Sequence, residues 1–277
     1  MSESPSSSVH PTAVIHPGAR IGPGSRIGPY AVIDSDVVLG PECQVGPGVY
    51  LTGHTVIGAR NRFHAGAVVG DAPQDFKYDG SPTRLRIGDD NTFREHVTVH
   101  RSNKTTEDTV IGNGNLLMAG CHIGHNCQLG DHNVIANGAL IAGHAVLADR
   151  VFVSGTCLVH QMCRIGRLAL MQGGAGISRD LPPFCIARGN NGIAGLNVIG
   201  LRRAGVSAAE RLELRRAYHR LFRSRQPLQK ALATVRAEFP NSPLVLEMVE
   251  FMAASRRGIC RDTGSRTSRP DGGGGDE

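Results

Sequence analysis

The sequence contains no tryptophan, and aromatic residues make up only 4% of its 277 positions. Large cores usually draw much of their buried area from aromatic side chains, so a core of this chain must be built from small aliphatic residues. This argues against an ordinary globin, Rossmann or sandwich core. The composition also argues against a chain that is disordered as a whole, because 40% of the residues are apolar and a chain of this length can bury them.

Long apolar runs and disulfide motifs are absent as well. No stretch approaches the roughly 20 apolar residues that a membrane-spanning helix needs. The segment from Met1 to Ser8 has no basic region followed by an apolar one, so we do not expect a secretory signal. The seven cysteines are an odd number and include no Cys-x-x-Cys pair. We therefore expect reduced thiols and a cytoplasmic location.

Glycine, in contrast, is abundant, with 36 residues, and it accompanies a repeat of six. An apolar residue stands at every sixth position from Val9 to Ile177 in 26 of 29 steps. Chance would give roughly 12 at this apolar content. Glycine often follows the apolar residue, as Gly124 follows Ile123, which suits a turn of unusual φ and ψ. Such hexads are typical of a parallel β-helix.

The repeat resembles that of the hexapeptide acyltransferases, whose fold is a left-handed parallel β-helix. In that family three hexads make one triangular coil. The resemblance therefore implies about nine coils here, with residues 18 apart stacked at the ~4.8 Å strand spacing. Several cysteines lie two residues before an apolar step, which would be an inward position: Cys43, Cys121, Cys127, Cys157 and Cys163. We interpret them as core thiols that act as small hydrophobic side chains, with a metal cluster as the alternative.

Three positions of the repeat carry a polar residue instead of an apolar one, and they indicate where loops interrupt the β-helix. They fall at Asp75, Ser81 and Thr105 and predict two loops, near 71–86 and 102–109, where functional residues tend to lie. We expect the β-helix over 1–189, an α-helical domain over 190–260 and a disordered tail over 261–277. A capping-box pattern from Ser207 to Glu210 predicts a helix start, and further helices are expected near 227–238 and 243–256.

Positive charge is concentrated in the helical part. Residues 201–230 carry nine Arg or Lys against two Glu, a local charge of +7 in a chain whose net charge is +6. A solvated helix face explains this as well as an acidic protein or an anionic cofactor partner does. Nucleic acid binding is not expected, because aromatic residues for stacking are scarce and no recognition motif appears.

Histidines cluster in the middle of the repeat, at His100, His122, His125, His144 and His160. His125 and His144 are 19 residues apart, one coil plus one residue, so they should lie near one another. Histidine is the natural general base near neutral pH. Single histidines are often surface residues, but this grouping beside two loops predicts a catalytic site.

Motifs in this region resemble the UDP-N-acetylglucosamine O-acyltransferase family, from about Val9 to Ile259. The resemblance rests on NLLMAGCHIGHNC over 115–127, IAGH over 141–144, VHQ over 159–161, QDFKYDGSPT over 74–83, DLPP over 180–183 and GLRR over 200–203. It implies transfer of a 3-hydroxyacyl group from acyl carrier protein to the 3-hydroxyl of UDP-N-acetylglucosamine, the first step of lipid A biosynthesis. It also implies a homotrimer with active sites between subunits, and no metal or redox cofactor.

The resemblance also implies roles for particular residues. His125 matches the general base, and the backbone N–H of Gly143 matches the oxyanion donor. Asp75 and Lys77 match sugar-nucleotide contacts, with Lys77 and Arg203 suited to phosphate charge. The remaining matches are to the acyl, sugar, nucleotide and donor-arm pockets: His122, His144, His160, Gln161, Gly173 and Asn197. Gly173 matches the position that limits acyl chain length, which favours a long chain here, although the neighbouring Gln172 is unusual for the family. The basic helices would suit the acidic carrier protein.

Three positions depart from the family's common pattern. Asn126 stands where Asp is common, Ala204 where a second Arg is frequent, and Asn191 where His is common. Other readings are a γ-carbonic-anhydrase-like zinc enzyme, an acetyl-CoA-dependent sugar or serine acetyltransferase, and a non-catalytic scaffold or ice-binding β-helix. The sequence leaves open whether the acceptor carries a 3-hydroxyl or a 3-amino group.

Overall fold

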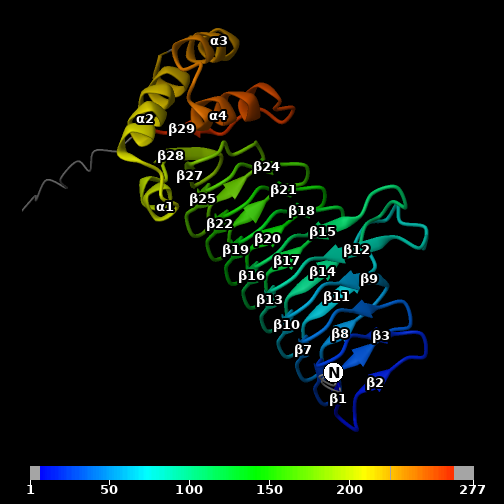
Figure 1. Cartoon of the computed structure of the whole chain (residues 1–277). Helices are drawn as coiled ribbons and strands as arrows, with labels where there is room; N and C mark the ends of the chain where they lie inside the picture. Colours follow the sequence, from blue (N-terminus) through cyan, green and yellow to red (C-terminus); the bar gives the residue numbers. More distant parts are fainter. Residues whose placement is uncertain (1–6, 225, 265–277) are drawn as a thin grey trace, which may run out of the picture.

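The computed structural model describes residues 7–224 and 226–264, and its body is a triangular column of short parallel strands (Figure 1). The strands form three sheets of 12, 9 and 8 strands. Consecutive strands belong to different sheets, so the chain winds around the column and each coil adds one strand to each sheet. The predicted fold class, a left-handed parallel β-helix followed by a small α-helical region, is confirmed.

The strands are named by sheet. The first sheet contains β1 (Ser8–Val9), β4 (Arg26–Ile27), β7 (Gln44–Val45), β10 (Arg62–Phe63), β13 (Thr92–Phe93), β16 (Leu116–Leu117), β19 (Val134–Ile135), β22 (Phe152–Val153), β25 (Leu170–Met171), β27 (Cys185–Arg188), β28 (Gly192–Leu196) and β29 (Arg261–Asp262). The second sheet contains β2 (Val14–Ile15), β5 (Val32–Ile33), β8 (Tyr50–Leu51), β11 (Val68–Asp71), β14 (Thr98–His100), β17 (His122–Ile123), β20 (Leu140–Ile141), β23 (Leu158–Val159) and β26 (Gly176–Ile177). The third sheet contains β3 (Arg20–Ile21), β6 (Val38–Leu39), β9 (His54–Ile57), β12 (Arg84–Ile87), β15 (Thr109–Ile111), β18 (Gln128–Leu129), β21 (Val146–Leu147) and β24 (Arg164–Ile165).

The repeated apolar residue fills the inside of the column. In the second sheet Ile123 pairs with Ile141 and Ile141 with Val159, and all three are buried. Aliphatic side chains make up most of the core, with a stack of Phe63 on Phe93 whose ring centroids are 4.7 Å apart. The seven cysteines are all free and buried, which confirms the interpretation of the five cysteines in the repeat as core thiols. Each fully buried aliphatic side chain is worth about 1.5–3 kcal/mol.

The two loops are insertions of whole hexads. Strand partners are 18 residues apart in most coils, as Ile27 and Val45 are, but 30 apart for Phe63 and Phe93 and 24 apart for Val99 and Ile123. The first loop therefore adds two hexads and the second adds one, which is why the period of six survives both. The loops occupy 72–83 and 101–108, slightly different limits from those predicted, because β11, β12 and β15 run further into them.

Both loops leave the column at one edge. The first connects β11 to β12 and the second connects β14 to β15, so each runs from the second sheet to the third. The turns after β17, β20 and β23 cross the same edge. We call it the histidine corner, defined by these two loops and these three turns. In Figure 1 the loops project from the column beside β12.

The C-terminal part covers the last coil with four helices, α1 (Val198–Arg203), α2 (Ala208–Arg223), α3 (Leu228–Glu238) and α4 (Pro243–Ala253) (Figure 1). The predicted capping box is present, because Ser207 and Glu210 exchange side-chain and backbone hydrogen bonds at the start of α2. Helix α1 was not predicted, since it has only six residues and contains Gly200, a poor helix former. Among the described helices, none offers an apolar stretch of the length that a bilayer crossing requires.

Two predicted boundaries differ from the structure. The division at 189/190 falls inside the antiparallel hairpin of β27 and β28, which extends the first sheet. In the predicted disordered tail, Arg261 and Asp262 form β29, which pairs with β28. An ion pair holds this strand in place, in which Arg223 Nε donates to Asp262 Oδ2 at 2.6 Å. The amino-acid composition of the tail gives no indication of this contact. Residues 265–277 of that tail lie outside the described residues.

Two arginines of the last coil attach helix α4 to the column. Arg164 Nε donates to Asp180 Oδ2 at 3.0 Å, and Asp180 is only 1% exposed. The same guanidinium donates to the carbonyl of Phe251 in α4 at 2.7 Å and stacks over its ring. Arg167 pairs with Glu247 of α4 at 2.6 Å. The helices are therefore fixed on the end of the β-helix by groups from both parts.

Candidate active site

The histidine corner brings His125 and His144 together. Each follows a strand of the second sheet, β17 or β20, and their rings meet edge to face with centroids 5.1 Å apart. His144 has a φ of 59° and Asn126, beside His125, also has 59°. Both turns therefore contain a residue in the left-handed conformation, which asparagine tolerates better than most residues. The contact between the two rings confirms the proximity predicted from their 19-residue spacing.

Asn126 is buried and uses all four hydrogen-bonding positions of its amide. Its Oδ1 lies 2.9 Å from His125 Nδ1 and accepts from the backbone N–H of Asn103 at 3.0 Å. Its Nδ2 donates to Ser102 Oγ at 2.7 Å and to Glu107 Oε2 at 3.2 Å. The side chain next to His125 is therefore held in one orientation by residues of the second loop.

The first loop joins the same network. Asn103 Nδ2 donates to Asp75 Oδ2 at 2.7 Å, and the backbone N–H of Lys77 donates to Asp75 Oδ1 at 3.0 Å. These two hydrogen bonds, led by that of Lys77, hold the pKa of the Asp75 carboxyl below its ordinary value. A chain of hydrogen bonds therefore connects Asp75 to His125 through Asn103 and Asn126, and all four residues lie at the histidine corner.

Gly143 lies directly against the His125 imidazole. A Cβ atom at this position would meet His125 Nε2 at 2.7 Å and Cε1 at 2.8 Å, closer than van der Waals contact allows. Among the described residues, no protein group accepts a hydrogen bond from the Gly143 N–H. A free backbone donor beside an imidazole can stabilise negative charge on a reacting oxygen.

Two further histidines lie on the second sheet next to this site. His100 and His122 meet edge to face with ring centroids 5.1 Å apart, and His122 Nδ1 lies 2.8 Å from Thr98 Oγ1. Burial lowers the pKa of His122 to about 4 and also lowers that of His100. Both rings are therefore neutral near pH 7. Burial, with His125 as the next cause, lowers the pKa of His144 as well.

His160 lies one coil further along the histidine corner, where it borders a cavity of about 530 Å³ between β20, β23 and β26. Arg257 donates to His160 Nδ1 at 3.1 Å and to the carbonyl of Ser178 at 3.1 Å. His160 Nδ1 also lies 3.3 Å from the carbonyl oxygen of Gln161. The neighbouring Gln161 is exposed. Asn191 lies on the other side of this cavity, where its side-chain oxygen accepts a hydrogen bond from the backbone N–H of Ser178 at 2.7 Å.

Asn197 and Arg203 occupy a different part of the molecule. They border a groove of about 740 Å³ on the outer face of the first sheet, together with Gln172. The Asn197 amide caps α1 by accepting from the Gly200 N–H at 3.0 Å, and it donates to the Leu168 carbonyl at 2.9 Å. Within one chain this groove lies across the column from the histidine corner, because the first sheet faces the edge between the other two.

Gly173 lies at a third place, in the turn between β25 and β26 that joins the first sheet to the second. It is exposed, and a Cβ there would meet its nearest neighbour, the Gly155 carbonyl oxygen, at 3.8 Å. A side chain could therefore be accommodated at this position without rebuilding the coil.

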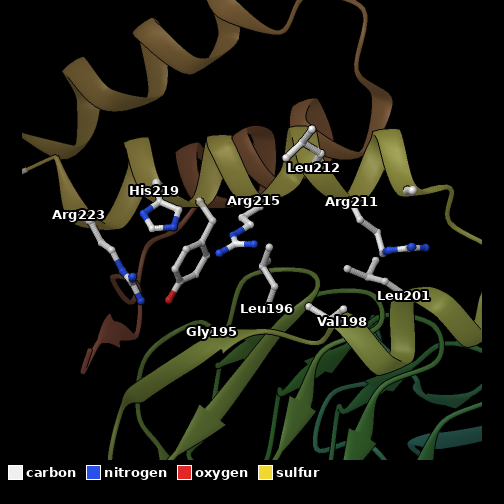
Figure 2. A pocket seen from close by; sticks show the side chains of 11 residues that line it. Gly195, Leu196, Val198, Leu201, Arg211, Leu212, Arg215, His219 and Arg223 are labelled. Carbon is white, nitrogen blue, oxygen red and sulfur yellow. The ribbon is translucent and has the colours of Figure 1, made fainter. Parts of the chain in front are cut away.

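The basic helix α2 forms a groove of about 400 Å³ with β28 and α1 (Figure 2). Its floor is apolar, with Leu196 and Val198, and Figure 2 shows Arg211, Arg215 and Arg223 along its α2 side. Arg223 is engaged with Asp262, whereas Arg215 and Arg216 are exposed and form no ion pair among the described residues. The described part of the chain contains no group of three or more His, Cys, Asp or Glu side chains placed to hold a metal ion.

Comparison with known proteins shows which family the chain is similar to. Residues 180–260 match the second domain of UDP-N-acetylglucosamine O-acyltransferase, and residues 36–71 and 108–143 match the bacterial transferase hexapeptide repeats. An acyl-[acyl-carrier-protein]–UDP-N-acetylglucosamine O-acyltransferase of Anaeromyxobacter sp. (strain Fw109-5) is 46% identical over 76% of this chain and 83% of that protein. The chain belongs to the UDP-N-acetylglucosamine O-acyltransferase family.

Solved structures of the family have the same fold. The UDP-N-acetylglucosamine acyltransferase of Francisella novicida matches with a TM-score of 0.89 and 32% identity, over 92% of this chain and 94% of that one. LpxA of Acinetobacter baumannii matches with a TM-score of 0.88 and 37% identity, over 91% of this chain and 99% of that one. The likeness therefore extends over both the β-helix and the helical part.

Sequence reasoning missed several residues of the site. Asn103, Ser102 and Glu107 belong to a loop that was singled out, but a loop without periodicity gives no signal for which of its side chains turn inward. Arg257 contacts His160 across 97 positions of sequence, a pairing that no local pattern indicates.

Proposed function

We propose that this protein transfers a 3-hydroxyacyl group from acyl carrier protein to the 3-hydroxyl of UDP-N-acetylglucosamine, the first step of lipid A biosynthesis. The observation that carries the mechanism is the contact between His125 and Gly143 at the histidine corner, where a Cβ on Gly143 would lie 2.7 Å from His125 Nε2. A base and a free backbone donor are thereby held side by side. Family membership supports the reaction class.

His125 Nε2 would take the proton of the sugar hydroxyl as its oxygen attacks the thioester carbonyl. The new C–O bond forms while the Gly143 N–H donates to the oxyanion. The C–S bond then breaks, and the proton passes from Nε2 to the departing pantetheine thiolate. A thioester is already activated, so a base, a charge-stabilising donor and alignment suffice for the chemistry.

Substrate binding is divided among the remaining residues. Asp75 and Lys77 of the first loop, with His122, His144, His160 and Gln161, would hold the sugar nucleotide and the nearby acyl group. Asn197 and Arg203 would hold the pantetheine arm, and Gly173 would leave the acyl groove open for a long chain. No metal or redox cofactor enters this scheme, because the acyl group arrives on the carrier protein's phosphopantetheine.

The placement of these two groups of residues supports a homotrimer. The histidine corner and the Asn197 groove lie on opposite sides of one column, so a single chain does not present both on the same face. Parallel columns packed around a threefold axis would bring the corner of one protomer against the groove of the next. Light scattering at micromolar concentration should give about three times 29.4 kDa, and a monomer would contradict this assembly.

The basic groove along α2 would receive the acidic carrier protein. Its apolar floor and its arginines on one side, seen in Figure 2, suit an acidic helix with an apolar anchor residue. The groove shares Leu196 and Val198 with the neighbouring Asn197 groove. A pantetheine arm leaving the carrier protein here would therefore enter the Asn197 groove directly.

The test is product identity. The purified protein is incubated with UDP-N-acetylglucosamine and 3-hydroxyacyl carrier proteins of different chain lengths, and the product is identified by mass. A parallel reaction contains the analogue whose 3-hydroxyl is replaced by an amine. We expect an O-acylated sugar nucleotide. A product formed only with the amine would move the acceptor to a 3-amino sugar, and no product with either would refute the proposed function.

A further inference from the structure

We infer that Glu107 is a positioning residue for His125 and that it acts through the side-chain amide of Asn126. This inference rests on the proposed function, because His125 is the base of that reaction. Its geometric basis is a chain of contacts at the histidine corner. Glu107 Oε2 lies 3.2 Å from Asn126 Nδ2, and Asn126 Oδ1 lies 2.9 Å from His125 Nδ1.

The contacts of Asn126 decide which atom of its amide faces His125. A backbone N–H, that of Asn103, can only donate, so the atom 3.0 Å from it must be the amide oxygen. An ionised carboxylate can only accept, so the atom facing Glu107 must be the amide NH2. The two requirements agree, and neither can be met if the amide is flipped.

This orientation fixes the tautomer of His125. Because Asn126 Oδ1 is an acceptor, His125 Nδ1 must carry the hydrogen that it shares with that oxygen at 2.9 Å. The other nitrogen, Nε2, is then unprotonated and faces Gly143. A general base needs an unprotonated nitrogen on the side of the substrate. Without a fixed amide, the neutral ring would divide between its two tautomers.

Glu107 also supplies the charge that an amide lacks. Its carboxylate polarises the Asn126 amide toward His125 and favours the imidazolium that forms during the reaction. The other charged groups around it are Lys104, whose Nζ lies 3.5 Å from Glu107 Oε1, and His144, whose Nδ1 lies 3.9 Å from Oε2. Asp75 adds a second carboxylate through Asn103. The carboxylates of Glu107 and Asp75 thus stand in for a carboxylate next to His125, and Lys104 offsets part of the charge of Glu107.

The experiment compares Glu107→Gln with the matched control Glu95→Gln. Glu95 is also a partly exposed carboxylate near an imidazole, 3.5 Å from His64 Nδ1, but it lies outside the histidine corner. The pH profile of kcat/KM is measured for both variants and for wild type. For Glu107→Gln we expect the acid limb to move to lower pH and kcat at neutral pH to fall about threefold to tenfold. Glu95→Gln should match wild type.

A third variant tests the path through Asn126. In the double variant Glu107→Gln/Asn126→Asp, a carboxylate contacts His125 directly, and both the acid limb and kcat should return toward wild type. A Glu107→Gln profile that superimposes on the Glu95→Gln profile would overturn the inference. So would a double variant with no recovery, because a merely structural role of Glu107 would not respond to a charge at 126.

A readout without substrate separates this inference from the proposed reaction. Protein labelled with 15N-histidine is examined by NMR, with the His125 signals assigned from His125→Gln. We expect the Nδ1-protonated tautomer of neutral His125 in wild type and a mixture of tautomers in Asn126→Ala. The Nε2-protonated tautomer in wild type would overturn the inference even if the transfer reaction proceeds. Absence of acyl transfer with the expected tautomer would refute the proposed function alone.

Discussion

Replacing Gly143 with alanine places one methyl group against the proposed base. The added Cβ would lie 2.7 Å from His125 Nε2 and 2.8 Å from Cε1, whereas carbon contacts are ordinarily about 3.5–4.0 Å. The imidazole must therefore move by roughly 1 Å, away from the oxygen that it would deprotonate. Misplacement on that scale costs on the order of 10²-fold in rate. The φ of Gly143 is not positive, so alanine itself is acceptable to the backbone.

The assay for Gly143→Ala measures kcat and KM for both substrates, together with the thermal unfolding midpoint. We expect kcat to fall about 10²-fold, with the midpoint within a few degrees of wild type. The matched control is Gly155→Ala, which has the same place in its hexad but lies on another edge of the column. Its Cβ would meet the Asn137 carbonyl oxygen at an ordinary 3.4 Å, so its kcat should stay near wild type. A Gly143→Ala enzyme within threefold of wild type would refute the contact between this turn and the base.

Three further predictions address the carrier protein, the acyl chain and pH. Arg215→Glu/Arg216→Glu should raise KM for acyl carrier protein and leave KM for the sugar nucleotide unchanged, with an effect that shrinks as salt is added; equal loss for both substrates would indicate damage to the fold. Wild type should prefer a donor of about fourteen carbons, and Gly173→Met should shift kcat/KM toward ten or twelve carbons, since each buried methylene contributes ~0.8 kcal/mol; an unchanged preference would place the end of the groove elsewhere. Because burial depresses the pKa of His122 to about 4, the unfolded chain binds the extra proton first as pH falls below about 6.5. The free energy of unfolding should therefore be unaffected by His122 above about pH 6.5 and should decrease by about 1 kcal/mol per pH unit from there down to about pH 4. In urea unfolding, the free energy of unfolding of His122→Gln should depend less steeply on pH in this window than that of wild type. Equal slopes for the two proteins would contradict the shift of the His122 pKa.

The repeat made most of the fold predictable. The period of six indicated a parallel β-helix, and the resemblance to the hexapeptide acyltransferases implied its triangular coil. The polar steps at Asp75, Ser81 and Thr105 marked both loops because each insertion is a whole number of hexads. Helices α2 to α4 were predictable from caps and periodicity. Helix α1 and strand β29 were not, since they are short and depend on contacts such as Arg223 with Asp262.

The site was only partly predictable. The number of residues per coil predicted that His125 lies beside His144. The same spacing gives no information on which side chains of the two loops contact these histidines. Asn126 illustrates the difference. As a sequence position it reads as a neutral replacement for a carboxylate. The structure adds Glu107 at 3.2 Å from its amide, a contact set by how the second loop folds back over the turn after β17.

Single-turnover acyl transfer by His125→Ala, with UDP-N-acetylglucosamine and a 3-hydroxyacyl carrier protein, is the most direct test of His125 as the general base. We expect a loss of about 10²–10⁴-fold in rate, as is typical of removing a general base. Substrate affinities and the thermal unfolding midpoint should stay near wild type. Transfer at a near wild-type rate, with loss appearing instead in His122→Ala or His160→Ala, would show that the base lies elsewhere.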